Sequence, residues 1–165
     1  MNPEGTESCN GIDDDCDDGD VCTADSCNSI AGCVQVFQDA DSDTVCDAQE
    51  FAPTDSGAFA IPGEITGLAF AADTITMSWD SAVPGSGMST VHDVLRGILN
   101  EFPIGSAGSS ENCLAPGISA ATATDSGPLG SNHGFWYLVR GRNVCGSGTY
   151  GSQSGGNPRV SSACP

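Results

Sequence analysis

Apolar and polar residues alternate most clearly over 74–80, where Ile75, Met77 and Trp79 are separated by polar neighbours. A period of two with one polar face predicts a half-buried antiparallel strand with those three residues directed inward. Similar short runs, separated by Gly, Ser and Pro, follow residue 63, and no long run has a period of 3.6 residues. The pattern predicts a mainly β protein. The expected strands cover 64–70, 74–80, 92–99, 119–124, 134–143 and 148–153.

The composition changes along the chain and divides it into three zones. Residues 1–50 are polar, acidic and dense in cysteine, and they read as a small irregular head. Residues 51–63 carry little charge and have prolines near both ends, which is typical of a linker. Residues 64–165 hold the expected strands and read as a separate β domain.

The acidic residues are concentrated in the head. The chain has a formal net charge of -18, and residues 1–55 hold 15 of its 22 acidic residues and none of its 4 basic ones. Such a segment repels nucleic acid and anionic membranes, so we expect neither as a partner. It also repels itself, which predicts either disorder or neutralisation by bound cations. No apolar run approaches the length of a membrane span.

Six of the nine cysteines lie in the head, at positions 9, 16, 22, 27, 33 and 46. This density favours a disulfide scaffold in an oxidising compartment over a disordered tail, and it predicts a secreted or cell-surface protein. Zinc is the alternative, but no Cys-x2-Cys pair occurs, and both histidines lie far from the head. His92 falls at an inward position of an expected strand, where a packed core residue is the expected role.

The segment 39–50 has the acid spacing of a calcium loop of the EF-hand type. If residue 39 is position one, acids occupy positions one, three, five, nine and twelve, and position seven offers a backbone carbonyl. The expected ligands are Asp39, Asp41, Asp43, Val45, Asp47 and Glu50. Position six, which is usually Gly because the loop turns sharply there, is Thr44. Hard oxygen ligands in this number select calcium over transition metals. The flanks do not read as paired helices, and the loop resembles the calcium repeats of thrombospondin type 3 and dockerin-like modules.

A second acidic segment reads Cys-Asn-Gly-Ile-Asp-Asp-Asp-Cys-Asp-Asp-Gly-Asp over 9–20. It resembles a metal-binding motif of secreted and surface proteins of bacteria. The resemblance implies Asn10, Asp13, Asp15 and Asp17 as ligands, with Asp14, Asp18 and Asp20 in reserve. Some proteins with this motif are linked to copper, but the all-oxygen ligand set here favours calcium, so two or more calcium ions are expected.

The following run, 16–33, resembles a small Cys-rich repeat in the same kind of protein. The resemblance implies the pairs Cys16–Cys27 and Cys22–Cys33, although sequence alone does not fix the connectivity. The disulfide set expected in the head also includes Cys9 and Cys46.

The tail, over about 64–160, resembles a fibronectin type III domain. The best match is the run from Phe135 to Gly148, which reads as the sixth strand and the turn after it. The implied fold is a sandwich of seven strands in two sheets. In such a sandwich Cys113 and Cys145 lie at the same end, so the resemblance implies that they pair and that Cys164 is left over.

These features favour a structural protein over an enzyme, because no nucleophile elbow, phosphate loop or Cys–His spacing occurs. The sequence predicts an extracellular, calcium-stabilised assembly or filament subunit with head-to-tail contacts. The alternative is an adhesion module that binds carbohydrate or protein. On the expected strand at 134–143, alternate residues would face outward and meet the acidic head of another copy. The expected contact residues are Trp136, Leu138, Arg140, Arg142 and Cys164.

Overall fold

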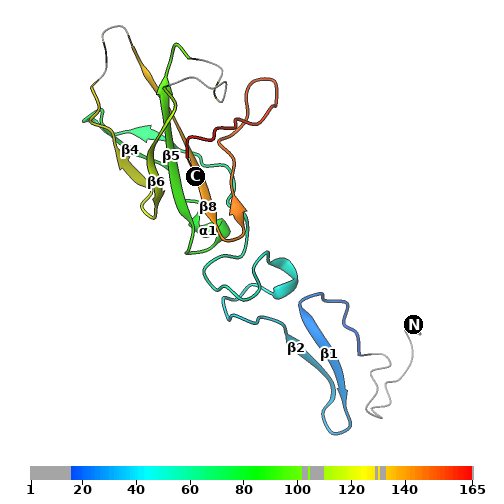
Figure 1. The fold of residues 1–165 in the computed structure, drawn as a ribbon. Coiled ribbons are helices and arrows are strands. Elements are labelled where there is room, and N and C mark those ends of the chain that lie inside the picture. Colours follow the sequence, from blue (N-terminus) through cyan, green and yellow to red (C-terminus); the bar gives the residue numbers. More distant parts are fainter. Residues whose placement is uncertain (1–15, 102–103, 105–109, 129, 131–132, 165) are drawn as a thin grey trace. The chain divides into compact units, whose positions relative to one another are not determined.

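A computed structural model describes residues 16–101, 104, 110–128, 130 and 133–164 (Figure 1). The chain forms two compact units, residues 1–56 and 57–165. The segment 51–63, which the sequence reads as a linker, is shared between them. The protein is mainly β, as predicted, with every sheet antiparallel.

The first unit is built on a β-hairpin that the sequence did not reveal. Strand β1 (Thr23–Asn28) pairs with β2 (Gly32–Phe37), and the register places Cys27 opposite Cys33. The Asn28 side chain closes the turn, because its Oδ1 accepts the N–H groups of Ile30 (2.9 Å) and Ala31 (3.1 Å). A short 3₁₀ helix, η1 (Asp47–Gln49), follows later in this unit. Strand β1 reads Thr-Ala-Asp-Ser-Cys-Asn and has no alternation of apolar and polar residues, which hides the hairpin from pattern reading.

The disulfides of the first unit differ from the expected pairs. Cys16 is bonded to Cys33, and Cys22 is bonded to Cys46. The expected pairs Cys16–Cys27 and Cys22–Cys33 are therefore wrong. Cys27 is also disulfide-bonded, and Cys9 lies outside the described residues. Cys16, Cys22 and Cys46 lie outside the two strands, so the path of the chain around the hairpin decides the pairing.

The described residues of the second unit form two sheets and one short helix. The three-stranded sheet has the order β3-β4-β7, and the four-stranded sheet has the order β6-β5-β8-β9. The helix α1 (Val83–Ser86) precedes β5. The strands are β3 (Ala69–Phe70), β4 (Thr76–Ser78), β5 (Val91–Ile98), β6 (Asn112–Ile118), β7 (Thr122–Thr124), β8 (Phe135–Asn143) and β9 (Gly146–Ser147).

The two longest strands, β5 and β8, lie where the sequence predicts them. Strand β6 was missed, and it contains Pro116. Proline removes a ladder donor, but β6 is the edge strand of its sheet, where proline is tolerated. Strand β3 covers only two residues of the range expected at 64–70. The strand expected at 148–153 is wrong, because β9 ends at Ser147 and Ser152 forms only an isolated bridge with Pro158.

The main core lies between the two sheets. Met77 of β4 packs against Val94 of β5 and Val139 of β8, with Trp79 in the same cluster. His92 is fully buried beside Trp79, with ring centroids 5.7 Å apart, and it is a core residue as expected. Ile75 was expected to point inward with Met77 and Trp79, but it is 42% exposed because it lies before the strand begins.

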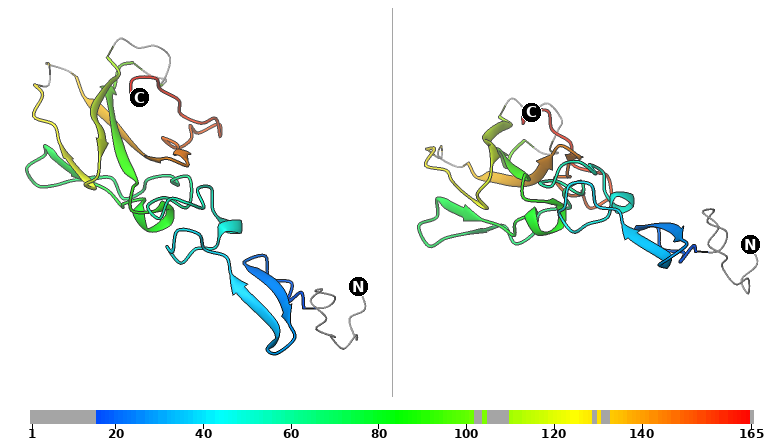
Figure 2. Two further views of the ribbon diagram at one scale, coloured as in Figure 1. Left: turned by 60° about the horizontal axis from the view of Figure 1, so that its bottom comes forward. Right: turned by 90° about the horizontal axis from the view of Figure 1, so that it is seen from below.

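A second apolar cluster lies on the other face of the four-stranded sheet. It joins Leu95 and Trp136 to Tyr150 and Cys164 of the chain after β8. That chain, orange to red in Figure 2, returns beside the sheet. Cys164 is bonded to Cys113 of β6, so the expected Cys113–Cys145 pair and the unpaired Cys164 are both wrong. The sequence placed a strand at 148–153 but gave no sign that the chain after β8 covers this face of the sheet.

The covering segment also changes the expected contact surface. Trp136 is 8% exposed and Cys164 is 4% exposed, so neither presents an apolar face to another copy. Leu138 packs, partly buried, against the same cluster. The outward direction predicted for these side chains is correct, but a segment of the same chain covers them.

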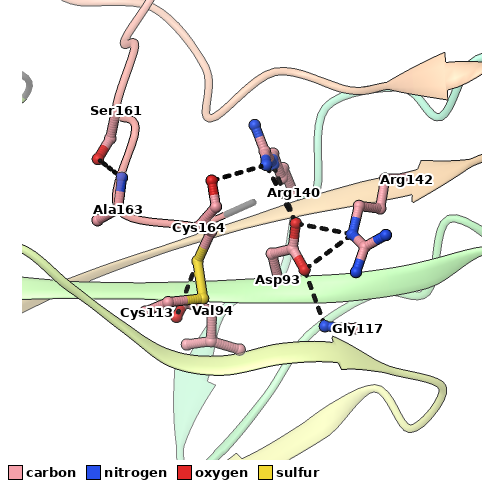
Figure 3. A network of polar contacts seen from close by, with 9 residues as sticks. All are labelled: Asp93, Val94, Cys113, Gly117, Arg140, Arg142, Ser161, Ala163 and Cys164. Atoms are coloured by element: carbon pink, nitrogen blue, oxygen red, sulfur yellow. Dashed lines mark hydrogen bonds and ion pairs between the residues drawn. A yellow bond between two sulfur atoms is a disulfide. The ribbon is translucent and has the colours of Figure 1, made fainter.

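The arginines of β8 are engaged by a buried aspartate (Figure 3). Asp93 is fully buried; its carboxylate accepts from Arg140 (Nε and Nη2, both 3.2 Å) and from Arg142 Nε at 3.1 Å. The Gly117 N–H donates to Asp93 Oδ1 at 2.8 Å, and Arg140 also donates to the carbonyl oxygen of Cys164 at 3.4 Å. The network joins β5, β8 and the covering segment, which means that both arginines have a structural role.

Candidate metal centre

The loop 39–50 is folded around the carboxylate of Asp39. That carboxylate accepts the backbone N–H groups of Ser42 at 2.7 Å, Thr44 at 3.0 Å and Asp43 at 3.3 Å. A first-position aspartate that binds several N–H groups of its own loop bends the backbone into a tight turn. One carboxylate oxygen from each of Asp39, Asp41 and Asp43 then lies within 4.8 Å of the others.

The backbone takes the left-handed conformation at the position where a calcium loop usually has glycine. Thr44 has φ 81°, and Ser42 has φ 66°. This conformation is costly for a residue with a Cβ, particularly a β-branched one. The Asp39 carboxylate holds the N–H of Thr44 in place. The departure from the glycine pattern therefore does not prevent the sharp turn.

Glu50 completes the cluster from the far end of the loop. The helix η1 ends immediately before it. Both Glu50 carboxylate oxygens are buried and have no hydrogen-bond partner among the described residues, and the same holds for Asp41 Oδ2. Burial, contact with the Asp43 carboxyl group and the nearby negative charges raise the pKa of Glu50 to about 7. Burial and the neighbouring carboxylates also raise the pKa of Asp41.

Buried carboxylate oxygens without donors are costly unless a cation balances them. The cluster offers only oxygen atoms: three aspartates could hold a metal ion, and Glu50 lies against Asp43 beside them. The donor set is that of hard divalent cations.

The other two expected ligands of this loop, Asp47 and Val45, form hydrogen bonds within the loop. Asp47 accepts the N–H of Ala40 at 2.8 Å, so it closes the loop across its two ends. The N–H of Val45 donates to Asp43 Oδ1 at 2.8 Å, which orients the Asp43 carboxylate.

A second acidic cluster contains Asp17, Asp18 and Asp25, whose carboxylate oxygens also lie within 4.8 Å of one another. Asp25 stands on β1, and its Oδ1 is buried without a partner among the described residues. The sequence missed Asp25, because only the hairpin brings it beside the earlier acids. The other oxygen, Asp25 Oδ2, accepts the backbone N–H of Asp18 at 3.3 Å.

The expected members of the second site are only partly described. Asn10, Asp13 and Asp15 lie outside the described residues. Asp17 is in the cluster, whereas Asp20 accepts the N–H of Cys22 at 2.9 Å and is not part of the triad.

Comparisons with protein-family models, with curated proteins and with solved structures found no match to this chain. Within the described part of the chain, no helix is both long and apolar enough to span a membrane.

Proposed function

We propose that this protein is an extracellular structural module whose first unit folds around calcium. The observation that carries the proposal is the state of Glu50. Both of its carboxylate oxygens are buried without a donor beside three converging aspartates, one of which, Asp41, also has a buried oxygen without a donor. A cation at this position removes the repulsion and replaces the missing partners. The second cluster, at Asp17, Asp18 and Asp25, supports a further ion.

Calcium is the best match among hard cations. Its coordination shell of six to eight oxygens tolerates irregular geometry, whereas magnesium requires a near-ideal octahedron. Extracellular calcium modules have Kd values of roughly 10⁻⁴ to 10⁻³ M, so the calcium outside a cell would occupy such a site. The disulfides fit the same compartment.

The second unit supports a scaffold role. We propose that it is a fibronectin type III-like sandwich, because its sheets have three and four strands and enclose one core between them. No catalytic constellation enters this proposal, and we assign no enzymatic activity. Because the motif at 9–17 resembles one found in secreted and surface proteins of bacteria, we still expect this protein to be one of them.

Self-assembly and carbohydrate binding stay predictions, and the residues that the sequence suggested for them do not form an exposed binding surface. The five residues expected at a head-to-tail contact are covered by the same chain or engaged with Asp93. Both tryptophans, Trp79 and Trp136, are buried, so neither forms an aromatic platform for a sugar.

Calcium-dependent protection of the loop tests the proposal. We expect hydrogen exchange in peptides covering 38–50 to slow when calcium replaces a chelator. Calcium at about ten times its Kd stabilises the bound state by roughly 1.4 kcal/mol. The variants Asp43→Asn and Glu50→Gln should lose the effect.

The matched control is Asp80→Asn, which makes the same change at an exposed acid of the second unit. It should respond to calcium as the unaltered protein does. Equal exchange of 38–50 with calcium and with chelator would disprove the calcium function.

A further inference from the structure

The disulfide Cys22–Cys46 ties the candidate calcium loop to a residue outside it. Cys46 stands between Val45 and Asp47, at the eighth position of the loop. Its partner Cys22 immediately precedes β1. The two Cα atoms are 5.4 Å apart, and both residues are buried, with Cys46 2% and Cys22 7% exposed. The bond therefore connects the middle of the loop to the hairpin.

Two backbone hydrogen bonds complete a closed brace around the loop. The Gln38 N–H donates to the carbonyl oxygen of Cys22 at 2.8 Å, and the Asp47 N–H donates to the carbonyl oxygen of Gln38 at 3.0 Å. Gln38 precedes the first position of the loop, and Asp47 follows Cys46. The start and the later half of the loop are thus both tied to Cys22, the residue immediately before β1.

This brace opposes the charge repulsion inside the loop. Asp39, Asp41 and Asp43 place carboxylate oxygens within 4.8 Å of one another, and Glu50 adds a fourth carboxylate at the far end. Without a cation these groups push the loop open. A covalent tie limits the opening and so lowers the ordering cost of binding a cation.

We propose that cation binding by the loop 39–50 and closure of the Cys22–Cys46 disulfide are thermodynamically coupled, so that the redox state of this bond regulates calcium affinity. The inference rests on the proposed calcium function. Linkage makes the effect reciprocal: the closed bond tightens calcium binding, and bound calcium protects the bond.

The redox step uses an external dithiol as the reductant. The Sγ–Sγ bond of Cys22–Cys46 breaks and takes up two electrons from the dithiol. The two thiol protons of the reductant end on Cys22 and Cys46, and the reductant closes its own disulfide. Both sulfur atoms belong to buried residues, so attack requires the loop to open first. Bound calcium disfavours that opening.

The first experiment measures calcium affinity by hydrogen exchange of peptides covering 38–50. In Cys22→Ser/Cys46→Ser the calcium midpoint should rise at least about tenfold, within the range of known allosteric couplings. The matched control is Cys16→Ser/Cys33→Ser, which removes the other described disulfide of the same unit and should change the midpoint less than about twofold.

The second experiment uses the unaltered protein and does not depend on a variant that folds. Dithiothreitol reduces the protein with and without calcium, and alkylation with mass spectrometry follows each cysteine. Calcium at about ten times its Kd should slow reduction of Cys22–Cys46 about tenfold. The Cys113–Cys164 bond in the same sample is the internal control and should reduce at an unchanged rate. Asp43→Asn should abolish the protection.

The outcomes separate the inference from the function on which it rests. If calcium does not protect 38–50 in the unaltered protein, the calcium function and the coupling both fail. If calcium protects the loop but the Cys22→Ser/Cys46→Ser variant binds it equally well, or reduction is equally fast with calcium, only the coupling is overturned.

Discussion

Replacement of Asp93 by Asn removes the charge at the centre of the second unit while keeping the side-chain shape. The carboxylate is fully buried and accepts from two guanidinium groups and from the Gly117 N–H. An asparagine has only one acceptor oxygen, and its amide N–H₂ would face an arginine donor. Arg140, whose side chain is 13% exposed, would lose its counter-charge.

The expected cost is about 3 kcal/mol. Removal of one partner from a buried ion pair costs roughly 3–5 kcal/mol, because the remaining charge stays away from water. The Arg142 side chain is 36% exposed, so solvent screens part of its loss and the estimate falls at the lower end. A domain is stable by roughly 5–15 kcal/mol, so the change is a large fraction of the total.

Tryptophan fluorescence during urea unfolding measures this cost in the second unit alone. The chain has two tryptophans, and both are buried there. Asp80→Asn is the matched control: Asp80 is exposed and accepts from the Thr66 hydroxyl at 2.8 Å, so it should cost less than about 1 kcal/mol. If Asp93→Asn costs no more than Asp80→Asn, the network is not a source of stability.

Three further predictions concern packing, crosslinking and pH. Cys113→Ser/Cys164→Ser should destabilise the second unit by roughly 4 kcal/mol in the chain-entropy model, since the bond spans 51 residues. It should also shift Trp136 emission to the red, and unchanged emission and stability in urea would contradict the prediction. Gly97→Ala should cost roughly 1–3 kcal/mol, because a Cβ there collides with the Trp136 indole; the same urea assay decides it. The raised pKa of Glu50 means that the folded, metal-free state favours the protonated acid. The metal-free first unit should therefore lose stability as pH rises from 4.5 to about 7, and calcium should remove this trend in circular-dichroism melts.

Residue spacing alone was enough to predict part of the acidic loop. Asp39, Asp41 and Asp43 were predicted as ligands from their alternation, and the structure brings their carboxylates together. Such a site is local, because a dozen consecutive residues supply it and alternate side chains of a tight turn point inward. The two long strands β5 and β8 were found for the same reason: their patterns lie within one segment.

Features that depend on distant segments were not predictable from the sequence. Asp25 joins Asp17 and Asp18 only through the hairpin. The pairs Cys22–Cys46 and Cys113–Cys164 depend on which segments pack side by side, and no spacing rule encodes that. Trp136 was correctly placed on the outer face of its strand, yet it is buried, because the chain after β8 returns to cover it. Local alternation determines which face a side chain occupies, whereas only the tertiary structure decides what that face meets.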